Sequence, residues 1–172
     1  MNLLDRLGLL VDGIEAVARA AVLGLTLVVL LVMLAQVFFR YVLNSSLQWS
    51  EELAVWGMVW MVFVGSVLLV RRSEHISITT LVRLAPLPVR PYLVIFNRAA
   101  GLVFLAIVGW YGFEVFGGTF HAKSPSIGLS TRWIKLAIPV GAVLMAVVAV
   151  HAIADDLRRL ANRDFASFGE VD

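Results

Sequence analysis

Four long apolar runs constrain this chain more than any other feature of its sequence. They cover residues 20–39, 53–70, 93–113 and 136–154. Three of the runs contain no Asp, Glu, Lys or Arg, and the third holds Arg98 close to one end. About 20 mostly apolar residues are enough for a helix to cross about 30 Å of hydrocarbon. The runs therefore predict four membrane-spanning helices, with Arg98 extending its long side chain to the headgroups.

The composition supports a membrane protein and excludes other classes. The 172 residues are 60% hydrophobic and 15% charged, with a mean hydropathy of +0.91. A soluble domain is about 45–50% apolar and about 25% charged, so a soluble globule of this size would expose large apolar patches. The absence of cysteine excludes disulfides, thiolate metal sites and cysteine nucleophiles. We predict one all-α integral membrane domain over residues 1–172, with no enzymatic activity and no cofactor.

The distribution of basic residues predicts the orientation of the spans. Ten of the 14 Lys and Arg residues fall in the N-terminal segment, in the loop between the second and third runs together with Arg98 at the adjoining end of the third run, and in the tail at residues 155–172. The other four fall on the opposite side, which predicts that both termini and the tail lie in the cytoplasm. Tyr41, Trp49 and Trp133 would then belong to the outer aromatic belt, and Tyr92 to the inner one. The small excess of Lys and Arg over Asp and Glu, placed beside the spans, indicates membrane lipid as a partner and does not indicate nucleic acid.

Residues 2–19 have the periodicity of an amphipathic helix, with leucines and valines on one half and charged residues on the other. This segment either lies in the cytoplasmic interface before turning into the first span, or packs on its own chain. We expect the first span to be uncleaved, because its apolar run is too long for a signal peptide and Val37, Phe38 and Phe39, directly before Arg40, form no small-residue cleavage site. The loop at 71–91 could hold one short helix, and the Gly-, Ser- and Pro-rich loop at 114–135 is expected to be irregular.

The densest polar segment is residues 40–52, which join the first two spans. The candidate functional residues of this segment and of the span that follows are Arg40, Asn44, Trp49, Glu51, Glu52, Trp56 and Trp60. The two glutamates lie in the first turn of the second span, where a helix N-terminus favours negative charge. One interpretation is a clasp of Arg40 with Glu51 or Glu52 beside an aromatic face packed inside the chain. The other is that this face, which also includes Phe63, contacts a partner subunit.

Other chemistry has weaker support in the sequence. Gln36 is the strongly polar side chain inside the first span, and the spans show no evident ion pathway, so transport by this chain alone is not favoured. His75 and His151 could face one another as haem ligands, but His75 lies beyond the charged Arg71 and Arg72. Four-residue spacing of small residues suggests close helix contacts at Ala16, Ala20 and Gly24, and at Ala142 and Ala146.

Two segments carry a resemblance to a known family. The first reads Phe38-Phe39-Arg40-Tyr41-Val42-Leu43-Asn44-Ser45-Ser46-Leu47-Gln48-Trp49-Ser50-Glu51-Glu52 and continues through Trp56, Trp60 and Gly65 to Glu74-His75-Ile76. The second reads Ser124-Pro125-Ser126-Ile127-Gly128-Leu129, followed by Trp133 and Ile138-Pro139-Val140-Gly141. In order and spacing they resemble the small membrane subunit of TRAP transporters, the tripartite ATP-independent periplasmic carriers of bacteria. One departure is Thr79 after Ile78, where the family often has an acidic residue, so a charge interaction at that position is in doubt.

The resemblance implies a specific role. In that family a large permease subunit carries substrate and sodium by an elevator-type motion, after a periplasmic binding protein has captured the substrate. The small subunit is thought to brace the large one and to help dock the binding protein, in the uptake of an organic acid by symport. Two rival functions are a haem-bearing membrane anchor of a respiratory enzyme and a self-sufficient homo-oligomeric small transporter.

Overall fold

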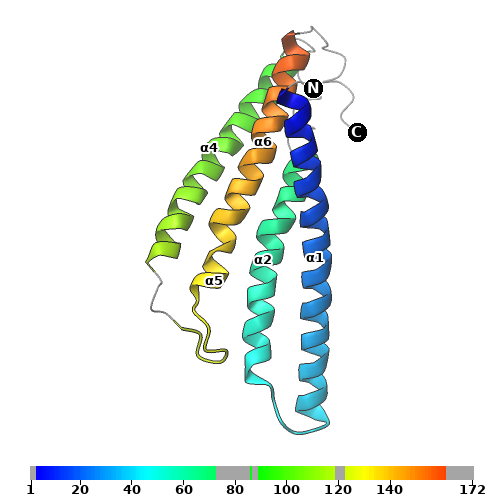
Figure 1. Cartoon of the computed structure of the whole chain (residues 1–172), viewed down its shortest axis with the longest axis vertical. Coiled ribbons are helices and arrows are strands. Elements are labelled where there is room, and N and C mark those ends of the chain that lie inside the picture. Colours follow the sequence, from blue (N-terminus) through cyan, green and yellow to red (C-terminus); the bar gives the residue numbers. More distant parts are fainter. Residues whose placement is uncertain (1–2, 73–85, 87–88, 119–122, 162–172) are drawn as a thin grey trace.

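The four predicted spans are four long helices in the computed structural model, which describes residues 3–72, 86, 89–118 and 123–161 (Figure 1). Within these residues the helices are α1 (Leu3–Tyr41), α2 (Gln48–Arg72), α4 (Arg90–Gly117) and α6 (Ala137–Ala161), with the short α5 (Arg132–Lys135) before α6. Each long helix is apolar and long enough to cross a membrane. The prediction of an all-α protein with four membrane-spanning helices is confirmed. The loop predictions at 73–85 and 87–88 and the tail from residue 162 lie outside the described residues.

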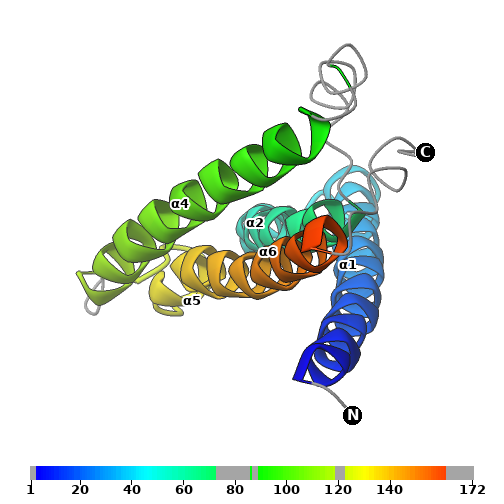
Figure 2. The same ribbon diagram turned by 90° about the horizontal axis from the view of Figure 1, so that it is seen from above.

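The helices form an open arrangement in which α6 is central. Helix α4 packs on α6, α6 packs on α2, and α2 packs on α1, while α1 also reaches α6 (Figure 2). About 39% of the apolar stretch of α6 is buried, against 6% in α1 and in α4. Helices α1 and α4 therefore expose most of their apolar surface. The two ends are named after the predicted orientation: the end at which α1 begins and α6 ends is the inner end, and the opposite end is the outer end (Figure 1).

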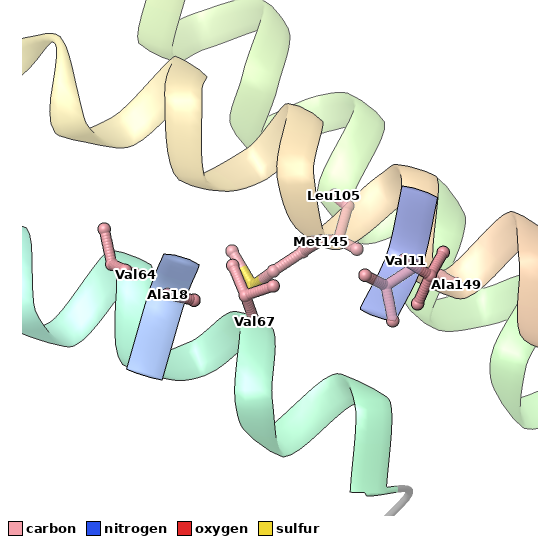
Figure 3. Packing of buried hydrophobic residues seen from close by; sticks show 8 residues of the cluster. Val11, Ala18, Val64, Val67, Leu105, Met145 and Ala149 are labelled. Atoms are coloured by element: carbon pink, nitrogen blue, oxygen red, sulfur yellow. The ribbon is translucent and has the colours of Figure 1, made fainter. Parts of the chain in front are cut away.

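The core lies where α6 meets the other three long helices. It is built of mostly small apolar side chains: Val11, Ala18, Val64, Val67, Leu105, Met145, Val148 and Ala149. The close-up view places Met145 of α6 near both Val67 of α2 and Leu105 of α4 (Figure 3). One flexible methionine thus belongs to a core cluster shared by α2, α4 and α6, as expected of a side chain that fills irregular gaps.

Two glycines show how closely the helices approach. A Cβ added to Gly57 of α2 would lie 2.6 Å from a methyl carbon of Val29 on α1, and one added to Gly112 of α4 would lie 2.8 Å from a methyl carbon of Ile138 on α6. Helices can approach this closely where a residue lacks a side chain. Of the small residues selected by spacing, Ala142 is buried in the interior, but Ala16, Ala20 and Gly24 are exposed on α1.

The amphipathic segment and the first span form one unbroken helix, α1. Val11 and Ala18 of the segment are buried in the core. The structure therefore favours packing on the chain itself over a separate helix that turns to lie in the interface.

The outer loop before α5 is more ordered than the sequence suggested. Its residues 123–130 form a small hairpin, in which Lys123 and Ser130 make an antiparallel bridge and the Ser124 amide donates to the Leu129 carbonyl over 2.8 Å. Gly128 has a φ of 76°, a left-handed conformation that glycine adopts without strain. The expected irregular loop is present in that residues 123–131 contain no regular helix or strand, although backbone hydrogen bonds order them; the expectation is wrong for Arg132–Lys135, which form α5.

Candidate functional site

The outer end of the α1–α2 pair brings together several of the predicted site residues. The Gln36 side-chain amide on α1 donates to Glu51 Oε1 on α2 over 2.8 Å. Between the helices the chain turns at Asn44, which has a φ of 49°, a conformation that asparagine tolerates better than most residues. The buried Ser50 donates its hydroxyl to the Leu47 carbonyl over 2.6 Å, which satisfies a carbonyl at the start of α2. Gln36 was noted in the sequence only as a polar residue, without a partner.

Glu52 and Trp60 connect α2 to the chain that leads into α6. The Ser126 amide of the hairpin donates to Glu52 Oε2 over 3.2 Å, and the Trp60 indole N–H donates to the Trp133 carbonyl over 3.2 Å. These contacts join residues more than 70 positions apart. They link the two segments that carried the family resemblance.

Arg40 does not make the expected clasp. Its guanidinium carbon lies 5.9 Å from the ring centre of Tyr41, and among the described residues it forms no ion pair with Glu51 or Glu52. Glu51 instead accepts a hydrogen bond from Gln36, and Glu52 accepts one from the hairpin backbone. Arg40, Asn44 and Trp49 remain exposed at the outer end, with Trp49 at 43%.

The aromatic face of α2 is partly used inside the chain. Phe63 packs against Gly141 of α6, where an added Cβ would lie 2.8 Å from the Phe63 Cβ atom. Trp56 is half-buried and lines an apolar groove of about 200 Å³ between α1 and α2. Trp60 lines the same groove. The groove exposes almost no polar atoms and offers no group that could bind a polar substrate.

The inner end carries an ion-pair cluster that the sequence did not reveal. Arg71 at the end of α2 lies 2.7 Å from Asp12 and 3.5 Å from Glu15 on α1, and Arg19 lies 2.7 Å from Glu15. The sequence placed Asp12, Glu15 and Arg19 on the charged face of an amphipathic helix and Arg71 at the end of the second span, but it did not pair them. Their pairing requires α1 to continue straight past the end of α2, which the amphipathic pattern alone did not establish.

A second ion pair joins α4 to α6. Arg98 Nη1 lies 3.1 Å from Asp156 Oδ2, and the two side chains are 23% and 7% exposed. The sequence analysis assigned Arg98 to the headgroups and did not identify Asp156, on the neighbouring helix, as its counter-charge. The sequence did contain an indication of this ion pair, because a charged residue within a span usually pairs with another group.

The described residues include no group of three or more His, Cys, Asp and Glu side chains that could hold a metal ion. His75 and His121 lie outside the described residues. His151 faces α1, where a Cβ on Gly8 would lie 3.6 Å from its Nε2 atom. The geometry of both ends thus holds helices together, and the described part shows no arrangement of a nucleophile with a base.

Comparison with known proteins identifies relatives over most of the chain. The model of a family described as "Tripartite ATP-independent periplasmic transporters, DctQ component" matches residues 29–159. The sialic acid TRAP transporter small permease protein SiaQ of Vibrio cholerae is 29% identical over 88% of this chain and 86% of its own length. The C4-dicarboxylate TRAP transporter small permease protein DctQ of the same species is 31% identical over 63% of this chain and 47% of its own length.

A third relative is a longer protein. The sialic acid TRAP transporter permease protein SiaT of Haemophilus influenzae is 33% identical over 121 residues, or 70% of this chain. The matched part is 20% of that protein. This chain thus spans about a fifth of the length of SiaT.

Proposed function

The chain belongs to the family of DctQ components of tripartite ATP-independent periplasmic transporters, and from this premise we propose that it braces a large permease subunit during uptake of an organic acid. It is a small TRAP permease subunit and a multi-pass protein of the bacterial inner membrane. It is therefore a component of a transporter and not an enzyme.

The proposed partner is the large permease subunit. The observation that carries this proposal is the match to SiaT, in which a segment similar to most of this chain is part of a longer permease protein. A separate chain similar to one part of a longer permease protein is suited to bind a separate subunit that corresponds to the rest.

The proposed role is that of a static frame for an elevator-type carrier driven by sodium. A frame must resist the motion of its partner, which requires that its own helices be linked at both ends. The hydrogen bonds of Glu51 and Glu52 at the outer end, and the ion pairs of Arg71 and Arg98 at the inner end, supply such links. The proposed substrate is an organic acid because the relatives SiaQ and DctQ are named for sialic acid and C4-dicarboxylates, which are both carboxylates.

The outer end is the proposed site at which the periplasmic binding protein docks. Arg40, Asn44 and Trp49 are exposed there, beside the hairpin that Glu52 holds in place. A tryptophan and an arginine on a structurally fixed surface are typical of protein-binding sites.

Reconstitution tests the proposal. Proteoliposomes would contain the large subunit encoded with this chain, with or without the chain, and would be supplied with the binding protein, a sodium gradient and either sialic acid or a C4-dicarboxylate. We expect uptake of one acid that falls at least tenfold when the chain is omitted, and none with the chain alone. Equal uptake without the chain contradicts the bracing role, and uptake by the chain alone supports the self-sufficient transporter.

Substitutions at the outer end test the site. We expect Glu52→Ala and Arg40→Ala to lower uptake or the yield of the complex several-fold, because the first releases the hairpin and the second removes an exposed charge. Glu114→Ala is the matched control, because Glu114 is an exposed carboxylate at the outer end of α4. Unchanged yield and unchanged uptake in both variants would exclude these residues from the site.

A further inference from the structure

A groove with charged walls runs along the inner part of α1, separate from the apolar groove beside Trp56. It has a volume of about 380 Å³, and the side chains that line it follow one another along one face of the helix: Asp12, Glu15, Ala16, Arg19, Ala20 and Leu23. The two alanines leave room between the longer side chains because each ends at its Cβ atom. At about 1.5 Å per residue the groove is about 17 Å long. We call it the α1 groove.

The charges of the α1 groove form an alternating chain with Arg71 of α2. The Arg71 guanidinium lies 2.7 Å from Asp12 Oδ1 and 3.5 Å from Glu15 Oε2. Glu15 Oε1 lies 2.7 Å from the Arg19 guanidinium. The two ends of this chain, Asp12 and Arg19, have side chains that are 61% and 57% exposed, and its two middle members are more buried. The cluster therefore has no net charge and presents one carboxylate and one guanidinium to its surroundings.

Two helices independently place this cluster at the level of the lipid headgroups. The apolar run of the first span begins directly after Arg19, and that of the second span ends directly before Arg71. Arginines at the ends of apolar runs extend their charge to the interface. From Arg19 the groove continues about 6 Å to Leu23, inside the apolar run, and about 11 Å to Asp12, outside it. The headgroup region on one side of a bilayer is about 5–8 Å thick, so the α1 groove crosses it and enters the hydrocarbon.

The order of groups along the α1 groove specifies the class of lipid that fits it. From the hydrocarbon outwards come the apolar Leu23, the guanidinium of Arg19 and the carboxylate of Asp12. A phospholipid with a primary amine carries its acyl chains, its phosphate and its ammonium group in the same order. Arginine binds phosphate through several N–H donors, and a carboxylate accepts charge-assisted hydrogen bonds from an ammonium group. We propose that the α1 groove binds one phosphatidylethanolamine molecule of the leaflet at the inner end.

Other phospholipids match the charges of the α1 groove less well. Phosphatidylglycerol has a phosphate and no cation, so the carboxylates of the groove repel it. Phosphatidylcholine has a cation, but its nitrogen bears no N–H group and cannot donate to Asp12. A soluble amine with a phosphate has no apolar chain to place against Leu23. The assignment follows from the chain itself and does not depend on the proposed function.

Native mass spectrometry of the full chain in a mild detergent tests the proposal with these three lipids, matched in their acyl chains. We expect phosphatidylethanolamine to bind at least fivefold more tightly than phosphatidylcholine or phosphatidylglycerol. Asp12→Asn should reduce this preference to less than twofold, because it removes the exposed acceptor of the ammonium group. Arg19→Gln should weaken binding of all three lipids, because all three have a phosphate. Equal affinities in the wild-type chain, tightest binding of phosphatidylglycerol, or an unchanged preference in Asp12→Asn would each overturn the proposal.

A substitution that leaves every charge in place tests the α1 groove itself. Ala20→Leu fills the groove, and the chain accommodates the new side chain because Ala20 is exposed. Ala99→Leu is the matched control, because Ala99 is an exposed alanine on α4 beside the inner ion pair of Arg98. We expect Ala20→Leu to weaken binding of phosphatidylethanolamine at least fivefold and Ala99→Leu to leave it unchanged. Equal binding by the two variants would show that the lipid lies elsewhere and would overturn the proposal.

Discussion

The α1–α2 pair and the α4–α6 pair share a plan but differ in how their charges are placed. In each pair two neighbouring long helices cross at a glycine, Gly57 or Gly112, and an Arg–Asp contact joins the helices towards the inner end. The Arg71–Asp12 contact has side chains that are 33% and 61% exposed, whereas Asp156 beside Arg98 is 7% exposed. Both contacts join an arginine to an aspartate, but the contact of Arg98 is more buried, so we expect its loss to cost more free energy of unfolding.

The difference shows which contacts are indispensable. An exposed ion pair contributes little because water solvates either partner when the other is lost. A buried carboxylate that loses its arginine remains as an uncompensated charge in a medium of low dielectric constant. The α1–α2 pair also has the Gln36–Glu51 hydrogen bond as a second polar link, so it depends less on any one contact.

The largest effect is expected from Arg98→Ala. It should lower the free energy of unfolding by about 3–5 kcal/mol, because the buried Asp156 would lose the guanidinium of Arg98. Unfolding of the detergent-solubilised chain by increasing mole fractions of sodium dodecyl sulfate would measure this change. The double variant Arg98→Ala/Asp156→Ala should recover part of the loss. A cost no greater than that of Arg71→Ala would show that burial does not distinguish the two pairs.

An intermediate effect is expected at the crossing glycines. Gly112→Ala and Gly57→Ala should each cost about 1–3 kcal/mol, because the new Cβ would force Ile138 or the stiff Val29 side chain away. The controls are Gly101→Ala on α4 and Gly24→Ala on α1, where an added Cβ has no neighbour within 4 Å. These controls should be neutral or stabilising by up to about 1 kcal/mol, since alanine favours a helix over glycine. Equal costs at crossing and control positions, measured by the same titration, would contradict the close approach.

The smallest effect is expected from Arg71→Ala, at about 0–1 kcal/mol. The difference between this variant and the wild type should shrink as sodium chloride is raised from 50 mM to 1 M, because salt screens exposed charges. Arg98→Ala should show no comparable dependence on salt. A salt-independent loss at Arg71 would mean that its contacts with Asp12 and Glu15 are shielded from solvent.

The sequence predicted the spans well because the relevant property is local. A run such as residues 20–39 is apolar and of sufficient length whatever surrounds it, and the corresponding helix is present in the structure. The candidate segment at 40–52 was located for a similar reason, since its polar residues stand between two apolar runs. The amphipathic pattern at residues 2–19 likewise identified a helix, although not its continuity with the span.

Partners could not be predicted in the same way. Glu52 had Arg40 as a plausible partner in the sequence, but the structure pairs it with the backbone of a hairpin 74 residues away. For Arg98 the sequence suggested the lipid headgroups as the partner, and the structure shows an ion pair with Asp156. Which of several possible groups a charge contacts depends on distances of a few ångströms, because electrostatic and hydrogen-bond energies fall steeply with separation. The sequence by itself therefore determined that this protein crosses the membrane four times, a property set by runs of neighbouring residues. Only the tertiary structure decided which polar groups join the helices and which face of α1 is left uncovered, because both depend on how distant segments pack.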